Sequence, residues 1–218
     1  MLSRVQLFSV AILSFLTAAL LILHPLAAEE RGRFIRAGLP TLTPMGWADF
    51  CYRNETECTG GPPGGQVLEA TAVNLSLIER TNLLVNKQIV PKADADHWNV
   101  VDRWDLPMDG YGDCEDYALL KRKLLMEAGV PRRALLMTIV RDQMDEGHAV
   151  LAVRTTRGDL ILDNMTDEVK AWSRTPYRYV KQQSQEDPNV WVSIGPPVQT
   201  ARVFVIPAPV SSERISQR

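Results

Sequence analysis

The stretch Gly112-Asp113-Cys114-Glu115-Asp116-Tyr117 places a cysteine in the first turn of a predicted helix. Asp113 can cap this helix, and Asp116 three residues later resembles the second half of a capping box. The helix is expected to continue to Ala128, because apolar residues follow at helical spacing: Tyr117, Leu120, Leu124 and Leu125. Gly129 then supplies a typical C-terminal stop.

Short apolar segments separated by polar turns follow this helix. Three are rich in Val, Ile and Leu and are typical of antiparallel strands: residues 134–140, 148–154 and 159–163. Further strand candidates are residues 190–194 and 203–206. Upstream, we expect an amphipathic helix over residues 66–89 and a loop over residues 94–111. The pattern predicts an α+β fold in which the cysteine helix packs against an antiparallel sheet.

His148 and Asp163 are expected to lie at the same end of this sheet. One begins a predicted strand and the other ends the next, so antiparallel pairing returns them to one edge. A turn at Thr155-Thr156 would set them directly opposite each other. A turn at Arg157-Gly158 is more typical of a hairpin, but it would set Asp163 opposite Ala152, about 13 Å along the strand from His148.

The chain order of Cys114, His148 and Asp163 suggests a thiol nucleophile with a base and a residue that orients the base. The helix N-terminus lowers the pKa of a thiol, whereas the acidic neighbours Asp113, Glu115 and Asp116 raise it. A nearby imidazolium would therefore be needed to hold a thiolate. The alternatives are a buried structural thiol and a zinc site of Cys, His and Asp, although the sequence lacks a second close ligand such as a CxxC or HxxxH pair would provide.

The first residues indicate export. An apolar run covers residues 5–23 after Arg4, and residues 1–28 are expected to be a signal peptide, with an uncleaved anchor as the alternative. The protein would then be periplasmic or secreted, or anchored in the inner membrane. In an oxidising compartment Cys51 and Cys58 can close a small disulfide loop, which leaves Cys114 as the odd thiol.

The remaining chain divides into an extended arm over residues 29–65 that carries the disulfide loop, a domain over 66–210 and a tail over 211–218. With 218 residues and 45% hydrophobic residues, the composition is that of a globular protein with one core. The net charge is −2 and the chain has no basic stripe, which argues against nucleic acid as a partner.

Five motifs together resemble the bacterial transglutaminase-like cysteine proteinase family, over roughly residues 66–195. They are Trp104-Asp105-Leu106-Pro107, the block from Gly112 to Ala118, Gly129-Val130-Pro131, His148-Ala149-Val150-Leu151 and Ile161-Leu162-Asp163-Asn164. The resemblance implies a papain-like or transglutaminase-like core with Cys114, His148 and Asp163 as its triad.

The resemblance also implies a cofactor and partners. The LapG-type members are periplasmic proteases that bind calcium and cleave large surface adhesins, which releases cells from biofilms. An inner-membrane receptor that senses cyclic di-GMP holds them in check. The calcium ligands of those relatives map to Asp113 and Glu115, and the acids that would complete such a site here are Asp102, Asp105 and Asp109.

These observations favour an exported cysteine endopeptidase that acts on a protein substrate through a Cys-His-Asp triad. The first alternative keeps this chemistry but acts on glutamine side chains, as a transglutaminase or deamidase. The second is a catalytically silent binding module of the cell envelope.

Overall fold

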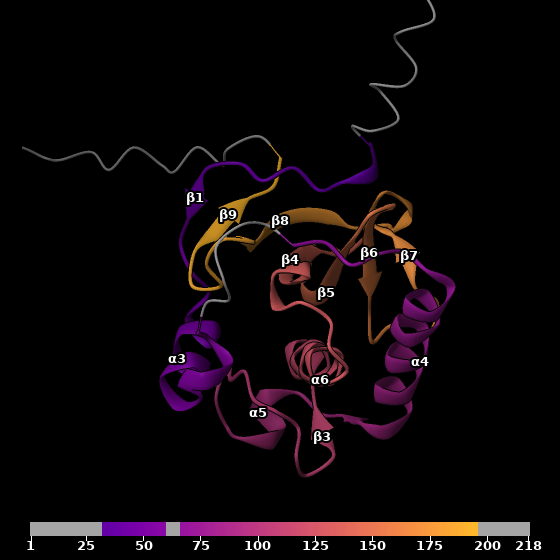
Figure 1. Cartoon of the computed structure of the whole chain (residues 1–218). Coiled ribbons are helices and arrows are strands. Elements are labelled where there is room, and N and C mark those ends of the chain that lie inside the picture. The colour runs from indigo at the N-terminus through magenta and orange to yellow at the C-terminus, as the bar shows by residue number, and fades with distance from the viewer. Residues whose placement is uncertain (1–31, 60–65, 196–218) are drawn as a thin grey trace, which may run out of the picture.

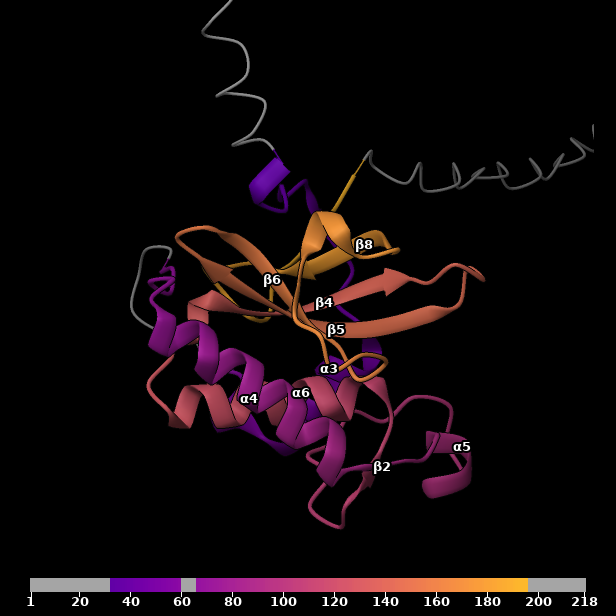
Figure 2. The same ribbon diagram turned by 90° about the vertical axis from the view of Figure 1, so that its right-hand side faces the viewer.

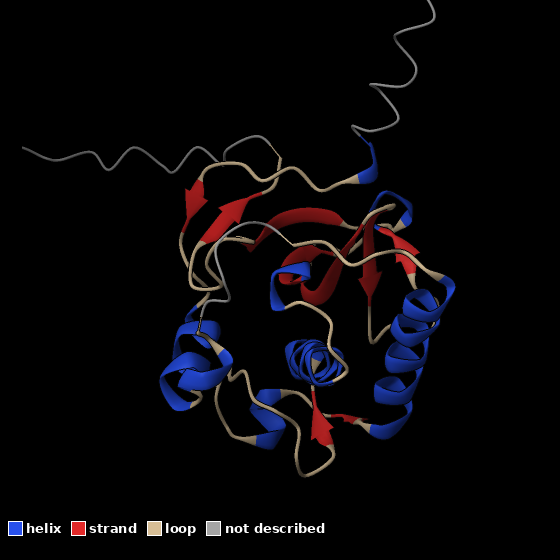
Figure 3. Ribbon diagram, in the orientation of Figure 1, coloured by secondary structure: helices blue, strands red, loops and turns tan. Residues whose placement is uncertain are grey.

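The computed structural model describes residues 32–59 and 66–195, which form a sheet with helices on one side (Figures 1 and 3). The expected signal segment 1–28, the strand candidate 203–206 and the tail 211–218 lie outside the described residues. Among the described residues, no helix combines the length and apolar character needed to cross a membrane.

The main sheet has seven antiparallel strands in the order β1-β9-β8-β4-β5-β6-β7. Its long strands are β4 (Leu135–Arg141), β5 (Gly147–Thr155), β6 (Gly158–Leu162) and β8 (Arg178–Gln183). The short ones are β1 (Pro40–Thr41), β7 (Lys170–Ala171) and β9 (Trp191–Ser193). The strands predicted from residues 134–163 and 190–194 are confirmed, whereas β8 was not anticipated.

The helices that lie wholly within the described residues are α3 (Met45–Arg53), α4 (Ala72–Gln88), α5 (Asp94–His97) and α6 (Cys114–Glu127). Turning the view shows α4 and α6 side by side beneath β4, β5 and β6 (Figure 2). A second, parallel pair joins β2 (Val90–Pro91) to β3 (Tyr111–Gly112) just before α6. The predicted α+β arrangement, with the cysteine helix against an antiparallel sheet, is confirmed.

Both faces of the central strands are buried, which explains their nearly continuous apolar sequence. Toward the helices, the side chains of Met137, Leu151 and Val153 pack in one cluster with Leu119 and Leu125 of α6. On the opposite face, a second cluster contains Ile35, Leu136, Val140, Val150, Ala152, Ile161 and Tyr179. The segment around Ile35 therefore covers the sheet face that the helices leave open.

Two glycines fix the ends of α6. A side chain at Gly112 would lie 2.7 Å from the Asp116 side chain, so only glycine permits this close approach. Gly129 has φ +89°, the left-handed conformation expected after a helix, and its N–H bonds the Met126 carbonyl. Asp113 occupies the predicted N-cap position, but its side chain makes no capping hydrogen bond, so this half of the predicted capping box is absent.

The other predicted boundaries also need correction. The helix expected from residue 66 begins at Ala72, because Leu68 pairs with Thr155 of the sheet and Thr71 caps the helix by accepting the Asn74 N–H. The loop expected over residues 94–111 contains α5, and the arm expected to be extended contains α3. This helix forms because Trp47 and Phe50 share its buried face.

The predicted disulfide between Cys51 and Cys58 is present, with its Cα atoms 5.5 Å apart. It joins the last turn of α3 to the end of the following 3-10 turn, Glu55–Glu57. Glu57 forms ion pairs with Lys123 and Arg122 of α6, which connect the disulfide loop to the cysteine helix. Cys114 is the one free cysteine of the described residues.

Candidate active site

The β5–β6 hairpin brings His148 and Asp163 together. Thr155 pairs with Gly158 and Leu151 with Leu162, so the two-residue turn is Thr156-Arg157. This register lies between the two that the sequence suggested, and neither of those was right. Continuing it places Asp163 beside Val150, on the same face as His148 and one diagonal step away. The step is bridged by a hydrogen bond of 2.9 Å between His148 Nε2 and Asp163 Oδ1.

Asp163 is held as a carboxylate at both of its oxygens. Oδ1 also accepts the backbone N–H of Met165 at 3.0 Å, and Oδ2 accepts the hydroxyl of Tyr177. Burial by itself would raise the pKa of this acid, but the hydrogen bonds from His148, Tyr177 and Met165 outweigh it and hold the pKa below its ordinary value. The ionised acid can therefore orient the imidazole and stabilise its protonated form.

Cys114 and His148 line one cavity of about 280 Å³, together with Trp104, Ile139 and Ala149. The backbone N–H of Ala149 lies 3.4 Å from Cys114 Sγ, which ties the start of α6 to β5. Because His148 Nε2 is engaged by Asp163, Nδ1 is the ring nitrogen left for the thiol. The three predicted residues are thus assembled from one helix and one hairpin, with the thiol and the imidazole facing a shared cavity.

The thiol lies beside an acid. Cys114 Sγ donates to Glu115 Oε2 at 3.0 Å. Burial is the first cause, and the Glu115 carboxylate the second, that raise the pKa of Cys114 well above its ordinary value. The sequence argument anticipated this acidic effect. In such surroundings the thiol needs a nearby positive charge before it can become a thiolate.

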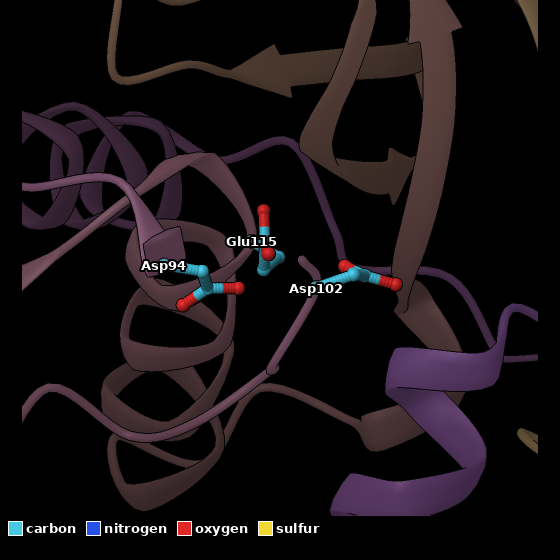
Figure 4. A group of neighbouring side chains, drawn as sticks. All are labelled: Asp94, Asp102 and Glu115. Atoms are coloured by element: carbon cyan, nitrogen blue, oxygen red, sulfur yellow. The ribbon is translucent and has the colours of Figure 1, made fainter. Parts of the chain in front are cut away.

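Three carboxylates come together next to Cys114, those of Asp94, Asp102 and Glu115, with oxygens within 4.8 Å of one another (Figure 4). They come from α5, from the loop that follows it and from α6. An overlapping group joins Asp94 to Asp113 and Asp116. Two buried oxygens, Asp94 Oδ1 and Asp113 Oδ1, have no hydrogen-bond partner within residues 32–59 and 66–195.

Burial and mutual repulsion raise the pKa values of these acids. Burial, reinforced by the charge of Asp113, raises the pKa of Glu115 to about 9 and that of Asp116 to about 8. Burial likewise raises the pKa of Asp94 and of Asp113. Buried acids that repel one another and leave oxygens unpaired form a donor set suited to a hard cation that prefers oxygen ligands, such as calcium.

The structure brings some of the predicted calcium ligands together and pairs others with basic residues. Asp102 and Glu115 belong to the first group with Asp94, and Asp113 belongs to the overlapping group; the two groups together are called the acidic cluster below. Asp105 lies outside it, and its Oδ2 accepts from Arg53 and Arg103. Asp109 also lies outside, paired with His97 at 2.8 Å.

Sequence reasoning missed Asp94 as a member of the cluster. It precedes Asp113 by 19 residues, and the contact depends on the pairing of β2 with β3, which brings the start of α5 to the start of α6: the Asp94 N–H donates to Asp113 Oδ2 at 3.2 Å. Asp94 is 3% exposed, and this burial cannot be predicted from the local sequence because it depends on tertiary contacts.

Comparison with known proteins gives one family match. The sequence model of the bacterial transglutaminase-like cysteine proteinases (BTLCP) matches residues 37–199. No curated protein matches the chain.

Among solved structures the chain is similar to calcium-bound LapG of Legionella pneumophila, with 27% identity over 61% of this chain and 76% of that one and a TM-score of 0.48. Legionella pneumophila LapG is also matched with 28% identity, 57% and 71% coverage and a TM-score of 0.47. EGTA-treated Legionella pneumophila LapG is 26% identical over 60% of this chain and 72% of that one, with a TM-score of 0.47.

Proposed function

The chain belongs to the bacterial transglutaminase-like cysteine proteinase family, and from that premise we propose that it is an endopeptidase whose triad is Cys114, His148 and Asp163. One observation carries the assignment of the residues. His148 is bonded to Asp163 through Nε2 and shares a cavity with the free thiol of Cys114. The base is thus bonded to the acid and faces the same cavity as the nucleophile, as a catalytic triad requires.

The proposed reaction follows from these contacts. His148 Nδ1 takes the proton of Cys114, and the thiolate sulfur attacks the carbonyl carbon of the scissile peptide bond. The imidazolium then protonates the leaving amine, which departs and leaves a thioester on Cys114. Water, deprotonated by His148, attacks the thioester and releases the new carboxyl terminus and the thiol. Asp163 holds the ring and stabilises its protonated form throughout.

The backbone N–H of Cys114 is expected to help bind the oxyanion that forms in both steps. It lies in the first turn of α6, where backbone N–H groups lack helical partners and point out of the helix.

We further propose that Asp94, Asp102, Asp113 and Glu115 hold a calcium ion. Support comes from the convergence of the carboxylates, their unpaired buried oxygens and a donor set made of oxygen alone. A bound calcium ion supplies positive charge that keeps these acids ionised and offsets their effect on the thiol.

The cellular setting is also a proposal. We propose that residues 1–28 direct export to the periplasm or the exterior, with retention in the inner membrane if they are not removed. Support comes from the apolar run and from the disulfide, which suits an oxidising compartment. We propose as substrate a large surface adhesin, whose cleavage would release biofilm cells, and as regulator an inner-membrane receptor.

Hydrolysis and transfer can be separated with isotopic water. Mature protein is incubated with an adhesin N-terminal fragment and with envelope proteins in H₂¹⁸O, with calcium, and the products are analysed by mass spectrometry. Endopeptidase action predicts fragments whose new carboxyl termini contain ¹⁸O, absent with Cys114→Ala. Cross-linked or deamidated glutamines without fragments would reject the peptidase in favour of a transglutaminase or deamidase.

Calcium binding is tested by calorimetry on protein stripped with a chelator. Binding in the micromolar to millimolar range is expected for wild type. It should be lost or at least about 10-fold weaker in Glu115→Gln and Asp94→Asn, since each removes one ligand charge. Asp109→Asn is the matched control, because this acid lies outside the cluster. Equal affinity in all four proteins would reject the assigned ligands.

A further inference from the structure

Tyr177 contacts both members of the acid–base pair. Its hydroxyl donates a hydrogen bond to Asp163 Oδ2, and its ring lies 5.4 Å from the His148 ring, centroid to centroid, at an interplanar angle of 57°. Among the described residues, Tyr177 is the hydrogen-bond donor to Oδ2, whereas Oδ1 is bonded to both His148 and Met165. The Tyr177 side chain therefore contacts the acid on the oxygen away from His148 and packs beside the imidazole ring.

The sheet delivers Tyr177 to this position independently of the β5–β6 hairpin. Val140 of β4 pairs with His148 on one side and with Tyr179 of β8 on the other. Tyr177 stands two residues before Tyr179, so it reaches the same end of the sheet as His148. The placement depends on β8, which is separate in sequence from all three proposed triad residues.

We propose that Tyr177 is a positioning residue that fixes the Asp163 carboxylate and the His148 ring in the orientation that presents Nδ1 to Cys114. This inference rests on the proposed triad. A buried carboxylate bonded through one oxygen can rotate about its Cβ–Cγ bond, and such rotation breaks the geometry of the bond to the imidazole. A donor on Oδ2 locks the plane of the carboxylate, and the tyrosine ring limits rotation of the imidazole.

The chemistry of the phenol suits this task. A tyrosine hydroxyl is neutral, so it donates to the carboxylate without adding a charge that would compete with the imidazolium. Burial, together with the bond to Asp163, raises the pKa of Tyr177 above its ordinary value. The hydroxyl therefore stays protonated and remains a donor over the whole range in which a cysteine peptidase would operate.

The test compares Tyr177→Phe with Tyr179→Phe in the full mature protein. Each substitution removes one phenolic hydroxyl near the same end of β8, but the Tyr179 hydroxyl contacts Thr175 Oγ1 and the Trp172 carbonyl rather than Asp163. Cleavage of one peptide substrate gives kcat and KM. Proton NMR of histidine-labelled protein reports the Nε2–H signal of His148, assigned by its absence in His148→Ala.

Because Tyr177→Phe removes a hydrogen bond to a charged group, we expect it to lower kcat about 10-fold or more. KM should change less than about 2-fold, because no substrate contact is lost. The Nε2–H signal should shift or broaden in Tyr177→Phe alone. Unchanged kcat and an unchanged signal would overturn the proposal, as would an equal loss in Tyr179→Phe. Wild-type protein that cleaves no peptide would reject the proposed function instead, so the two failures are distinct.

Discussion

Lys121 carries an ammonium group into the interior of the protein, and its substitution should stabilise the fold. The side chain is 0% exposed, and its Nζ has no hydrogen-bond partner within the described residues. Nζ lies over the face of the Tyr117 ring, 5.8 Å from its centroid. Lys121→Met keeps a long apolar stem of similar size and removes the buried charge.

The magnitude follows from the pKa of the amine. Burial lowers the pKa of Lys121 from its ordinary 10.5 to about 7, although the charges of Asp163 and Asp167 act in the opposite direction. Below pH 7 both folded and unfolded chains carry the proton, and the full cost of burying it applies, about 5 kcal/mol for a difference of this size. Between pH 7 and 10.5 the unfolded chain binds more protons, so this cost shrinks as the pH rises.

The assay is urea unfolding of wild type and Lys121→Met at several pH values between about 6 and 9.5. Lys121→Met should be more stable by several kcal/mol at pH 6, and the difference should narrow by roughly 3 kcal/mol by pH 9.5. Lys123→Met is the control, since Lys123 is on the same helix but is partly exposed and paired with Glu57. A constant difference for Lys121→Met across this range would refute the reasoning.

Three further changes test how the site is supported. Replacing both Cys51 and Cys58 with serine should lower the free energy of unfolding by about 2.5 kcal/mol, the loop-closure value for so short a loop, measured by denaturant titration. Arg154→Met should cost about 3–5 kcal/mol because it leaves the Asp159 carboxylate, 1% exposed, without its ion-pair partner. Asn86→Ala should accelerate amide exchange after β6, since this side chain donates to the carbonyl of residue 163 and to that of residue 166. Stability equal to wild type in the first two variants, or unchanged exchange in the third, would contradict these assignments.

The parts of the site that the sequence predicts are those encoded locally. The glycine before Cys114, the helical spacing after it and the glycine at residue 129 lie within one short stretch, and the structure forms α6 there. The hairpin was also predictable, because β5 and β6 are short apolar runs with one turn between them. Its register was not, since Gly158 pairs with Thr155 instead of occupying the turn.

The parts that were missed depend on contacts between distant segments. Asp94 belongs to the acidic cluster because β2 pairs with β3, which brings Asp94 next to Asp113. Tyr177 reaches Asp163 only because β8 pairs with β4. Neither residue stands in a local sequence motif. In each case the strand pairing that places the residue joins segments that are distant in sequence.

The activation of Cys114 by His148 is tested most directly by the rate at which a small neutral alkylating reagent modifies the thiol near pH 7. The site of modification is confirmed by mass spectrometry of the peptide that contains Cys114. The proposed pair predicts rapid alkylation in calcium-loaded wild type and a rate lower by about 100-fold or more in His148→Ala, the range expected for loss of a general base. Equal rates in the two folded proteins would contradict the proposed role of His148.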